Sequence, residues 1–350
     1  MARKALLVGI NDYQGISDLN GCINDVKNMR DILRNYFGFR NDDIRVLIDS
    51  RATKKNILTR LEWMVKNAKS GDVLVFHFAG HGSQVRDRDG DELRDRLDEL
   101  ICPYDMNWDG TYILDDDLDR IFNSVPNGAL LEVFLDCCHS GSGTDIASSR
   151  SVDFGFENPV RLRYLPPPFD ITCRYEGEEN ILSAPMGFKS ETRSTSRHVL
   201  WAGCRDNQTS ADAIIDGEPH GAFTYHFCRN LREADGNISR KELIDRIRYT
   251  IRNNSAQVPQ LECDQSSFDK RPLQFPALRS ADRLLFLTNP YMRGTDVQTV
   301  QEALAEQGYD IDTDGVFGPY TRVIVMKYQE KKGLLADGVV GPAVREALFG

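Results

Sequence analysis

The sequence predicts an α/β fold in which helices flank a mostly parallel sheet, followed by a small domain of three helices. Four short runs rich in Val, Ile, Leu and Phe support the sheet, at 4–10, 44–49, 72–78 and 130–138. Unbroken apolar runs of this length are typical of strands buried on both faces. Amphipathic helical patterns lie between them, and such alternation favours crossover units and parallel strands.

The helical patterns can be placed in order along the chain. The first runs over 23–36 and ends near Gly38, and the second begins at Thr53, a residue type that caps helices. Its apolar residues Ile57, Leu61 and Met64 recur at helical spacing. From 148 to about 197 the pattern gives way to Ser, Arg, Pro and Gly, which indicates a long loop or linker insertion. A strand at 198–204 and helices at 222–232 and 241–251 then complete the sheet domain.

The last sixty residues contain a repeat. DGVFGPYT at 314–321 recurs as DGVVGPAV at 337–344, and each copy combines an Asp-Gly turn with a proline placed to start a helix. The repeat predicts a second unit, so the expected domains are 1–288 and 289–350.

Composition narrows the function classes. The 350 residues include 53 acidic and 43 basic ones, and the net charge of −10 argues against general binding to nucleic acid or anionic membranes. We see no signal peptide, and no run approaches the roughly 20 apolar residues of a membrane span. The scattered cysteines favour reduced thiols in a cytoplasmic protein, and the absence of a CxxC pair argues against a structural zinc site.

The stretch EVFLDCCHSG at 132–141 raises the question of which cysteine is reactive. Neighbouring thiols do not easily form a disulfide with each other. Alternate side chains of a strand share a face, so Asp136 and Cys138 point one way while Leu135 and Cys137 point the other. Ligands bind at the carboxyl edge of open parallel sheets, which makes Cys138 the candidate nucleophile and Cys137 a packing residue.

A reactive thiolate needs a base, and two histidines belong to the neighbouring strand. His77 lies within the apolar run VLVFHFA and is best interpreted as a core residue. His81 follows the end of that strand, at the edge expected to hold Cys138. A buried structural Cys and His in a protein without enzymatic activity is the alternative interpretation.

Specific motifs then resemble a known family. HFAGHGSQ around His81 and DCCHSG around Cys138 resemble the histidine and cysteine motifs of metacaspases, whose prokaryotic members are also called orthocaspases. The resemblance covers residues 1 to about 275 and includes GCINDVKNM at 21–29, DELICPYD at 98–105, DDDL at 115–118 and GCRDNQTSADA at 203–213. It implies a caspase-like fold in which Cys138 attacks the scissile carbonyl and His81 is the general acid/base. The N–H groups of Gly82 and Cys138 would bind the oxyanion.

The same resemblance implies cleavage after Arg or Lys, because acidic side chains line the specificity pocket of the family. The matching positions are Asp25, Asp136 and nearby Cys22, and Arg pairs well with Asp. Without the family, Asp25 could equally be a polar residue in the first turn of a helix. The pocket acids and the basic stretch at 148–197 together predict self-cleavage within that stretch. The candidate sites are Arg150, Arg161, Arg163, Arg174, Lys189, Arg193 and Arg197.

A second group of carboxylates resembles the ligands of calcium-activated metacaspases. Asp98, Asp115, Asp116 and Asp145 are the matching positions, and converging carboxylates repel one another without a cation. We therefore expect Ca²⁺ as a cofactor. The acidic run at 87–92 lacks EF-hand spacing and is better interpreted as a solvated loop.

The C-terminal repeat closely resembles the three-helix peptidoglycan-binding module of cell-wall hydrolases, including Gln301 and Gln329. The leading hypothesis is a cysteine endopeptidase acting on proteins or peptides with Arg or Lys at the cleavage site. Its rival is a catalytically silent adaptor with a caspase-like fold, which binds wall fragments or a docking protein. A third possibility is ligation, in which an amine replaces water in attacking the acyl-enzyme.

Overall fold

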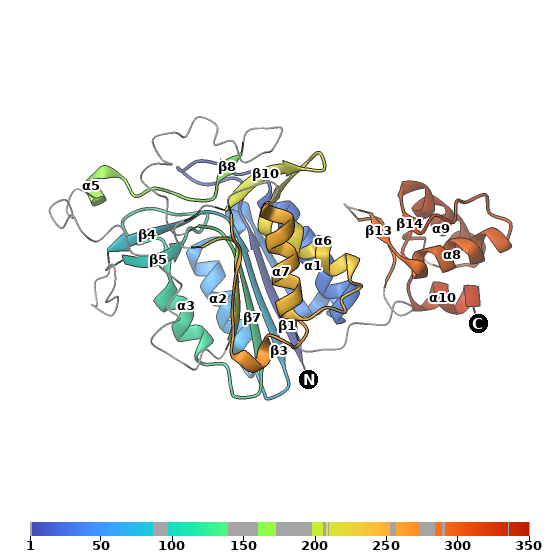
Figure 1. Ribbon diagram of the computed structural model, residues 1–350, viewed down its shortest axis with the longest axis horizontal. Helices are drawn as coiled ribbons and strands as arrows, with labels where there is room; N and C mark the ends of the chain where they lie inside the picture. The colour runs from blue at the N-terminus through green and yellow to red at the C-terminus, as the bar shows by residue number, and fades with distance from the viewer. Residues whose placement is uncertain are drawn as a thin grey trace.

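A six-stranded sheet forms the centre of the larger part of the molecule (Figure 1). The computed structural model describes residues 2–86, 97–138, 160–172, 198–205, 208, 210–252, 257–273, 284–288, 291–334 and 336–349. The strand order is β12-β9-β7-β3-β1-β2, and all neighbours are parallel except β12, which is antiparallel to β9. The strands are β1 (Arg3–Gly9), β2 (Ile44–Ile48), β3 (Val73–Ala79), β7 (Leu130–Asp136), β9 (His198–Ala202) and β12 (Gln260–Glu262).

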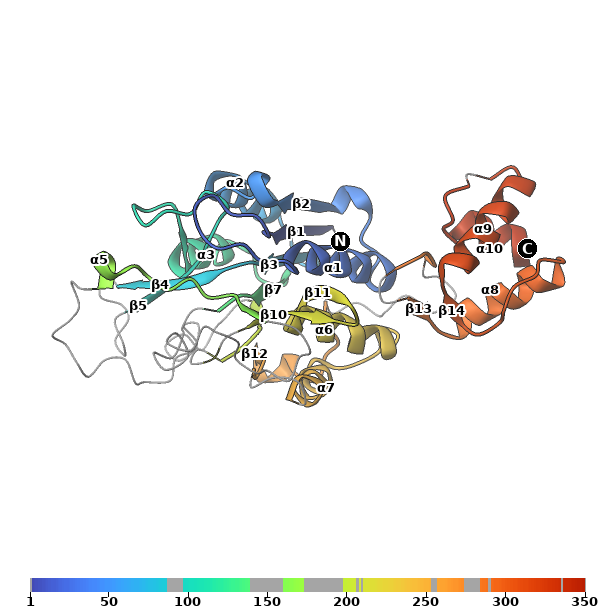
Figure 2. The same cartoon turned by 90° about the horizontal axis from the view of Figure 1, so that it is seen from above.

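Helices cover both faces of this sheet, because each helix has one apolar face to bury. One hydrophobic cluster joins the sheet to α1 (Cys22–Phe37), α6 (Ala222–Glu233) and α7 (Arg240–Arg252). The other cluster joins it to α2 (Lys54–Val65) and α3 (Asp115–Phe122), and Figure 2 shows the two layers on opposite sides. Gly38 ends α1 with a φ of 66°, and Thr53 caps α2 by accepting a hydrogen bond of 3.3 Å from the Asn56 N–H. Three 3₁₀ turns occupy Asn41–Asp43, Asp49–Arg51 and Gln265–Ser267.

Two small antiparallel sheets stand beside the carboxyl ends of the central strands. The first contains β4 (Gly82–Arg86), β5 (Leu97–Ile101) and β6 (Ile113–Leu114). The second contains β8 (Arg161–Leu162), β10 (Ala211–Ile215) and β11 (Glu218–Gly221), and the short helix α5 (Phe169–Thr172) follows β8. Both sheets therefore border the edge at which the sequence places the candidate nucleophile.

The C-terminal unit has its own hydrophobic core, separate from the two clusters on the large sheet. It comprises α8 (Thr295–Glu306), α9 (Pro319–Lys331), α10 (Pro342–Phe349) and the strand pair β13 (Met292–Arg293) and β14 (Val316–Phe317). The repeat has a structural basis. Gln301 accepts a hydrogen bond of 2.8 Å from the N–H of Gly315, and Gln329 accepts one of 2.8 Å from that of Gly338. Both glycines have positive φ, 71° and 74°, so each copy is the same turn clamped by the preceding helix.

The predicted fold class is confirmed, and the predicted strands differ from the observed ones by one or two residues at their ends. The domain boundary between 288 and 289 stays a prediction. Leu285 nevertheless pairs with Val340 through two backbone hydrogen bonds of 2.7 and 3.1 Å, so the C-terminal core draws on residues before that boundary. Within the described residues, none of the helices combines the length and apolar character that crossing a membrane requires.

Candidate active site

The edge of the central sheet brings the histidine and cysteine motifs together. β3 and β7 are parallel neighbours, with Ala79 opposite Asp136, so His81 and Cys138 both lie two residues beyond the paired ends. The N–H groups of Gly82 and Cys138 donate to one oxygen, the Arg163 carbonyl, at 3.0 and 3.2 Å. A Cβ atom at position 82 would overlap the Cys138 carbonyl, so this close approach of the two backbones requires glycine.

His81 is fixed through its Nε2 atom. That nitrogen lies 2.9 Å from the carbonyl oxygen of Ser17 and 3.3 Å from the Ser17 hydroxyl. The backbone N–H of His81 donates to the Tyr13 hydroxyl at 2.8 Å. Because a carbonyl oxygen only accepts, Nε2 carries the proton and Nδ1 holds the lone pair. Nδ1 is buried and has no hydrogen-bond partner among the described residues. Burial lowers the His81 pKa to about 4, so the ring is neutral at neutral pH.

Cys138 is fully buried rather than open to solvent at the sheet edge. Its thiol lies 3.7 Å from the Ser210 carbonyl oxygen and 3.7 Å from the thiol of Cys204, and it accepts a hydrogen bond from the Ser210 N–H. In the described part of the chain, no hydrogen bond joins the Cys138 thiol to the His81 ring. Cys137 packs on the other face of the strand with Leu135, and burial raises its pKa well above the ordinary value.

Three buried carboxylates surround the guanidinium of Arg163, and none of these four side chains is more than 1% exposed. Arg163 Nη2 lies 2.7 Å from Asp25 and 3.0 Å from Asp212, while Nη1 lies 3.3 Å from an Asp136 carboxylate oxygen and donates to the Asp136 carbonyl at 3.0 Å. Burial alone would lower the pKa of Arg163. The electrostatic attraction of Cys22 and the three carboxylates outweighs burial, so the pKa is raised. Cys22 is buried next to this group.

The backbone and neighbouring hydroxyl groups hold each carboxylate in place. Asp25 accepts the N–H of Gly221 at 3.0 Å, and Asp212 accepts that of Gly21 at 2.9 Å. Asp136 accepts the Ser210 hydroxyl at 2.6 Å and the Thr224 hydroxyl at 2.7 Å. Burial raises the pKa of Asp25 even with Arg163 beside it. The acids therefore form a rigid socket for a cation.

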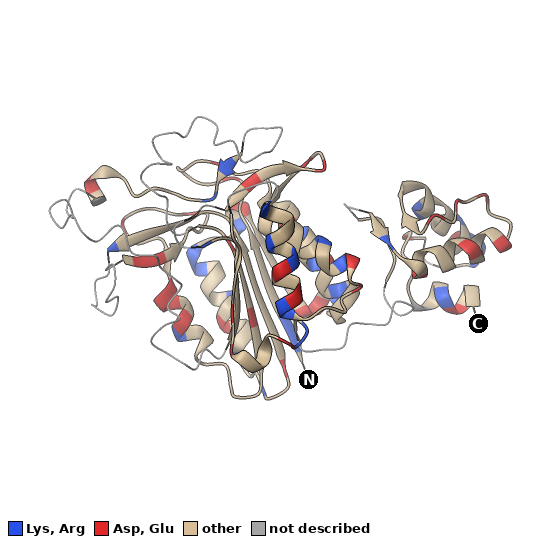
Figure 3. Cartoon of the chain, viewed as in Figure 1, with Lys and Arg blue, Asp and Glu red and all other residues tan. Residues whose placement is uncertain are grey.

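A second acidic group lies where β5 meets α3. Carboxylate oxygens of Asp98, Asp115 and Asp116 fall within 4.8 Å of one another, and red segments mark β5 and the start of α3 in Figure 3. An all-oxygen donor set suits a hard cation such as Ca²⁺ rather than zinc. The fourth expected ligand, Asp145, and the acidic run at 87–92 lie outside the described residues.

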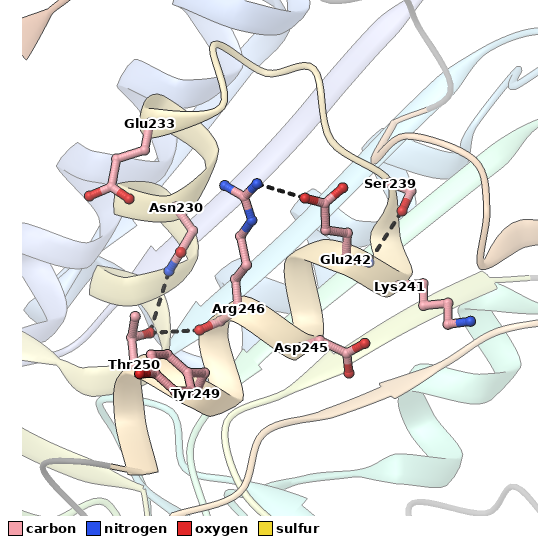
Figure 4. Close-up of a pocket in the computed structure, with 9 residues that line it drawn as sticks. All are labelled: Asn230, Glu233, Ser239, Lys241, Glu242, Asp245, Arg246, Tyr249 and Thr250. Carbon is pink, nitrogen blue, oxygen red and sulfur yellow. Dashed lines mark hydrogen bonds and ion pairs between the residues drawn. The ribbon is translucent and has the colours of Figure 1, made fainter.

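One surface pocket lies away from all of these predicted site residues, between α6 and α7 (Figure 4). Two of its charged side chains, Arg246 and Glu242, pair with each other at 2.6 Å. His77 lies in the core with its Nε2 atom 3.3 Å from the Thr224 hydroxyl, as a structural histidine should.

Known proteins similar to this chain decide its family. Residues 3–147 match the family model of the metacaspase, peptidase C14 domain. Metacaspase-1 of Schizosaccharomyces pombe is 34% identical over 287 residues, covering 75% of this chain and 67% of the relative. Metacaspase-1 of Ajellomyces capsulatus is 36% identical over 285 residues, covering 75% of this chain and 79% of the relative. The chain belongs to the metacaspase family. It is therefore a member of a family of cysteine peptidases with a caspase-like fold.

Two further similarities concern the fold and the C-terminus of this metacaspase family member. A crystal structure of a Geobacter sulfurreducens protein aligns with a TM-score of 0.56 and 23% identity, covering 79% of this chain and 100% of that one. This likeness bears on the fold alone. Residues 293–348 match the model of a peptidoglycan-binding domain, so the resemblance read from the repeat is confirmed.

Sequence reasoning missed three residues of the site. Asp212 completes the acidic socket, Cys204 contacts the Cys138 thiol, and Ser17 orients His81. Asp212 and Cys204 belong to the stretch GCRDNQTSADA that carries part of the family resemblance, so a signal for them was present. Ser17 acts through its carbonyl oxygen, which no residue type reveals.

Proposed function

We propose that this protein is a cysteine endopeptidase that cleaves peptide bonds after Arg, and less efficiently after Lys. The observation that carries the proposal is the buried Arg163 side chain, held by Asp25, Asp136 and Asp212 beside Cys138. Two guanidinium nitrogens reach three carboxylates, a fork that Arg provides and the point charge of Lys does not.

The proposed reaction begins with transfer of the Cys138 proton to Nδ1 of His81, the ring nitrogen that the Ser17 contact leaves unprotonated. The thiolate attacks the scissile carbonyl, and His81 protonates the departing amine as the acyl-enzyme forms. The N–H groups of Gly82 and Cys138, which converge on one oxygen here, stabilise the oxyanion. Water then hydrolyses the thioester and restores the thiol. His81 and Cys138 must come within hydrogen-bond reach when substrate binds, as catalytic groups often do.

Fluorogenic peptides ending in Arg, Lys or the neutral arginine analogue citrulline test this function. We expect rates in the order Arg, Lys, citrulline, with none for Cys138→Ala. A silent adaptor would bind the Arg peptide without releasing product, and it would bind equally well after Cys138→Ala.

We further propose that Asp98, Asp115 and Asp116 hold Ca²⁺ together with Asp145. The bound ion would neutralise carboxylates that otherwise repel one another, and so stabilise the junction of β5 and α3. Activity with Ca²⁺ would then exceed activity in a chelator.

The C-terminal unit is proposed to bind peptidoglycan fragments, supported by the family match at 293–348. A protein truncated before residue 284 should remain folded, because Leu285 and the residues after it have their own core. The test measures how much of the truncated protein and of the full chain sediments with purified peptidoglycan. Equal retention of both proteins would contradict wall binding.

A further inference from the structure

We propose that Cys138 and Cys204 form a reversible disulfide when a peroxide oxidises the site, and that Cys204 thereby protects the nucleophile from irreversible oxidation. The loss of activity that follows rests on the proposed peptidase function, whereas the disulfide itself does not. The inference comes from the contact between the two thiols, from the hydrogen bonds around them and from the strand ends that hold them.

The two thiols are in contact at neighbouring strand ends. Their sulfur atoms are 3.7 Å apart. β7 and β9 are parallel neighbours with Leu135 opposite Ala202, and the Gly203 N–H continues the ladder by donating to the Leu135 carbonyl at 2.8 Å. Adjacent chains in a sheet lie about 5 Å apart, a separation that a disulfide spans. The Cys138 and Cys204 sulfurs would therefore approach from 3.7 Å to about 2 Å to form the bond.

The buried side chain of Gln257 holds this arrangement in place. Its Nε2 atom donates to the Gly203 carbonyl at 2.6 Å and to the Ser210 hydroxyl at 3.0 Å. Gly203 precedes Cys204, and the Ser210 N–H donates to the Cys138 thiol. One side chain thus ties together the two backbone segments on which the thiol contact depends.

The hydrogen bonds give the two sulfurs different roles. Cys138 accepts the Ser210 N–H and the Cys204 S–H, and such donors stabilise a thiolate, the form of cysteine that reacts with a peroxide. The Cys204 thiol also lies 3.2 Å from the Gln208 carbonyl oxygen, which only accepts hydrogen bonds. The contact with Cys138 and burial raise the pKa of Cys204 well above the ordinary value, so Cys204 remains a thiol. Cys138 is therefore the sulfur that the peroxide oxidises, and Cys204 is the resolving thiol.

The reaction takes hydrogen peroxide as its oxidant and releases two water molecules. The Cys138 thiolate attacks one oxygen, the O–O bond breaks, and a sulfenic acid forms while the second oxygen leaves as hydroxide and takes up a proton. The Cys204 sulfur then attacks the Cys138 sulfur, the S–O bond breaks, and the departing hydroxide leaves as water with the Cys204 proton. Both sulfurs are oxidised as one peroxide is reduced. A dithiol reductant restores the two thiols by exchange.

The pair lies near the surface on the Cys204 side. Cys138 is fully buried, but Cys204 is 7% exposed and is followed by the exposed Arg205. Hydrogen peroxide is close to water in size, so it needs a smaller opening than the peptide that must reach Cys138 in the proposed reaction. Cys137 does not replace Cys204, because it packs on the opposite face of the strand and neighbouring cysteines bridge only with strain.

Peptide mapping under non-reducing conditions, after the full-length wild type has been treated with hydrogen peroxide, tests the disulfide directly. We expect a cross-linked fragment that contains Cys138 and Cys204, and an intact mass lower by about 2 Da for the two hydrogens lost. Cleavage of the Arg peptide should be lost completely and restored by dithiothreitol. A disulfide from Cys138 to another cysteine, or oxidised Cys138 without a disulfide, would overturn the proposal.

A serine at position 204 tests the protective role, because its oxygen cannot resolve a sulfenic acid. In Cys204→Ser, Cys138 should proceed to the sulfinic acid, about 32 Da heavier, which dithiothreitol does not reduce. Activity is expressed relative to the same protein before peroxide, and the loss should be permanent. Cys137→Ala, the matched control, should form the disulfide and recover as the wild type does.

Recovery of Cys204→Ser to the extent of the wild type would contradict the protective role. If this variant does not fold, the cross-linked fragment of the wild type still decides whether the disulfide forms. If no protein cleaves the Arg peptide before oxidation, the peptidase function fails, and the same fragment decides the disulfide independently.

Discussion

Replacing Asp25 with Asn tests the acidic socket at its shortest contact. The Asp25 carboxylate lies 2.7 Å from Arg163 Nη2, and both side chains are fully buried. Truncating one partner of such a pair costs about 2–5 kcal/mol. Asp136 and Asp212 remain in this variant, so we expect the lower part of that range, about 2–3 kcal/mol, which corresponds to about 30- to 160-fold in kcat/KM for an Arg peptide. Asn keeps an oxygen that accepts the Gly221 N–H, so the backbone nearby should stay in place.

The assay compares Arg and citrulline peptides for wild type and Asp25→Asn, after intact mass shows that both proteins are in the same processing state. The loss should be confined to the Arg peptide, because citrulline has no charge to lose. Asp31→Asn is the matched control, since Asp31 lies on the same helix but pairs with the partly exposed Arg30 at 2.9 Å. An unchanged Arg rate in folded Asp25→Asn would refute the electrostatic reasoning.

Three further results are expected. Cys138→Ala should abolish labelling by a thiol-reactive Arg peptide, whereas the Cys137→Ala protein should still be labelled and should lose about 1 kcal/mol of stability. Labelling of Cys138→Ala but not of Cys137→Ala would make Cys137 the nucleophile. Calorimetry should show Ca²⁺ binding weakened at least about tenfold by Asp115→Asn but not by Asp117→Asn, whose carboxylate forms a surface ion pair; equal affinities would remove the proposed site. His226 has a pKa lowered by burial from 6.5 to about 4, so the unfolded chain binds more protons between these values and stability falls as pH drops through that window. His226→Phe should flatten this fall in thermal denaturation by up to about 3 kcal/mol, and an unchanged pH profile would contradict the shift.

Local patterns were enough to predict a mostly parallel sheet and the positions of five of its strands along the chain. Strand alternation separated Cys137 from Cys138, and the structure has Cys137 in the hydrophobic core with Leu135. Position relative to a strand end separated His77 from His81 in the same way. These predictions depend only on residues close together in sequence, because a strand backbone fixes the face to which each successive side chain points.

Contacts between distant segments could not be predicted in this way. Asp212 reaches Arg163 across 49 residues, through the pairing of β8 with β10. β8 consists of two residues inside a stretch that has no strand pattern, so no periodicity indicates that pairing. The burial of Cys138 has the same origin, because it depends on which segment lies against the sheet edge.

The socket also predicts what the enzyme rejects. Three buried carboxylates tolerate one another only with a cation between them, because a buried charge without a partner is strongly disfavoured. A neutral side chain would leave the carboxylates uncompensated, and an Asp side chain would add a fourth negative charge. In the proposed function, specificity therefore rests on the penalty for the wrong side chain as much as on attraction to the right one. We expect no cleavage of a peptide ending in Asp that otherwise matches the Arg substrate, at any pH where the socket is ionised. Turnover of that peptide by the folded protein, abolished by Cys138→Ala, would show that Asp25, Asp136 and Asp212 do not form the specificity pocket.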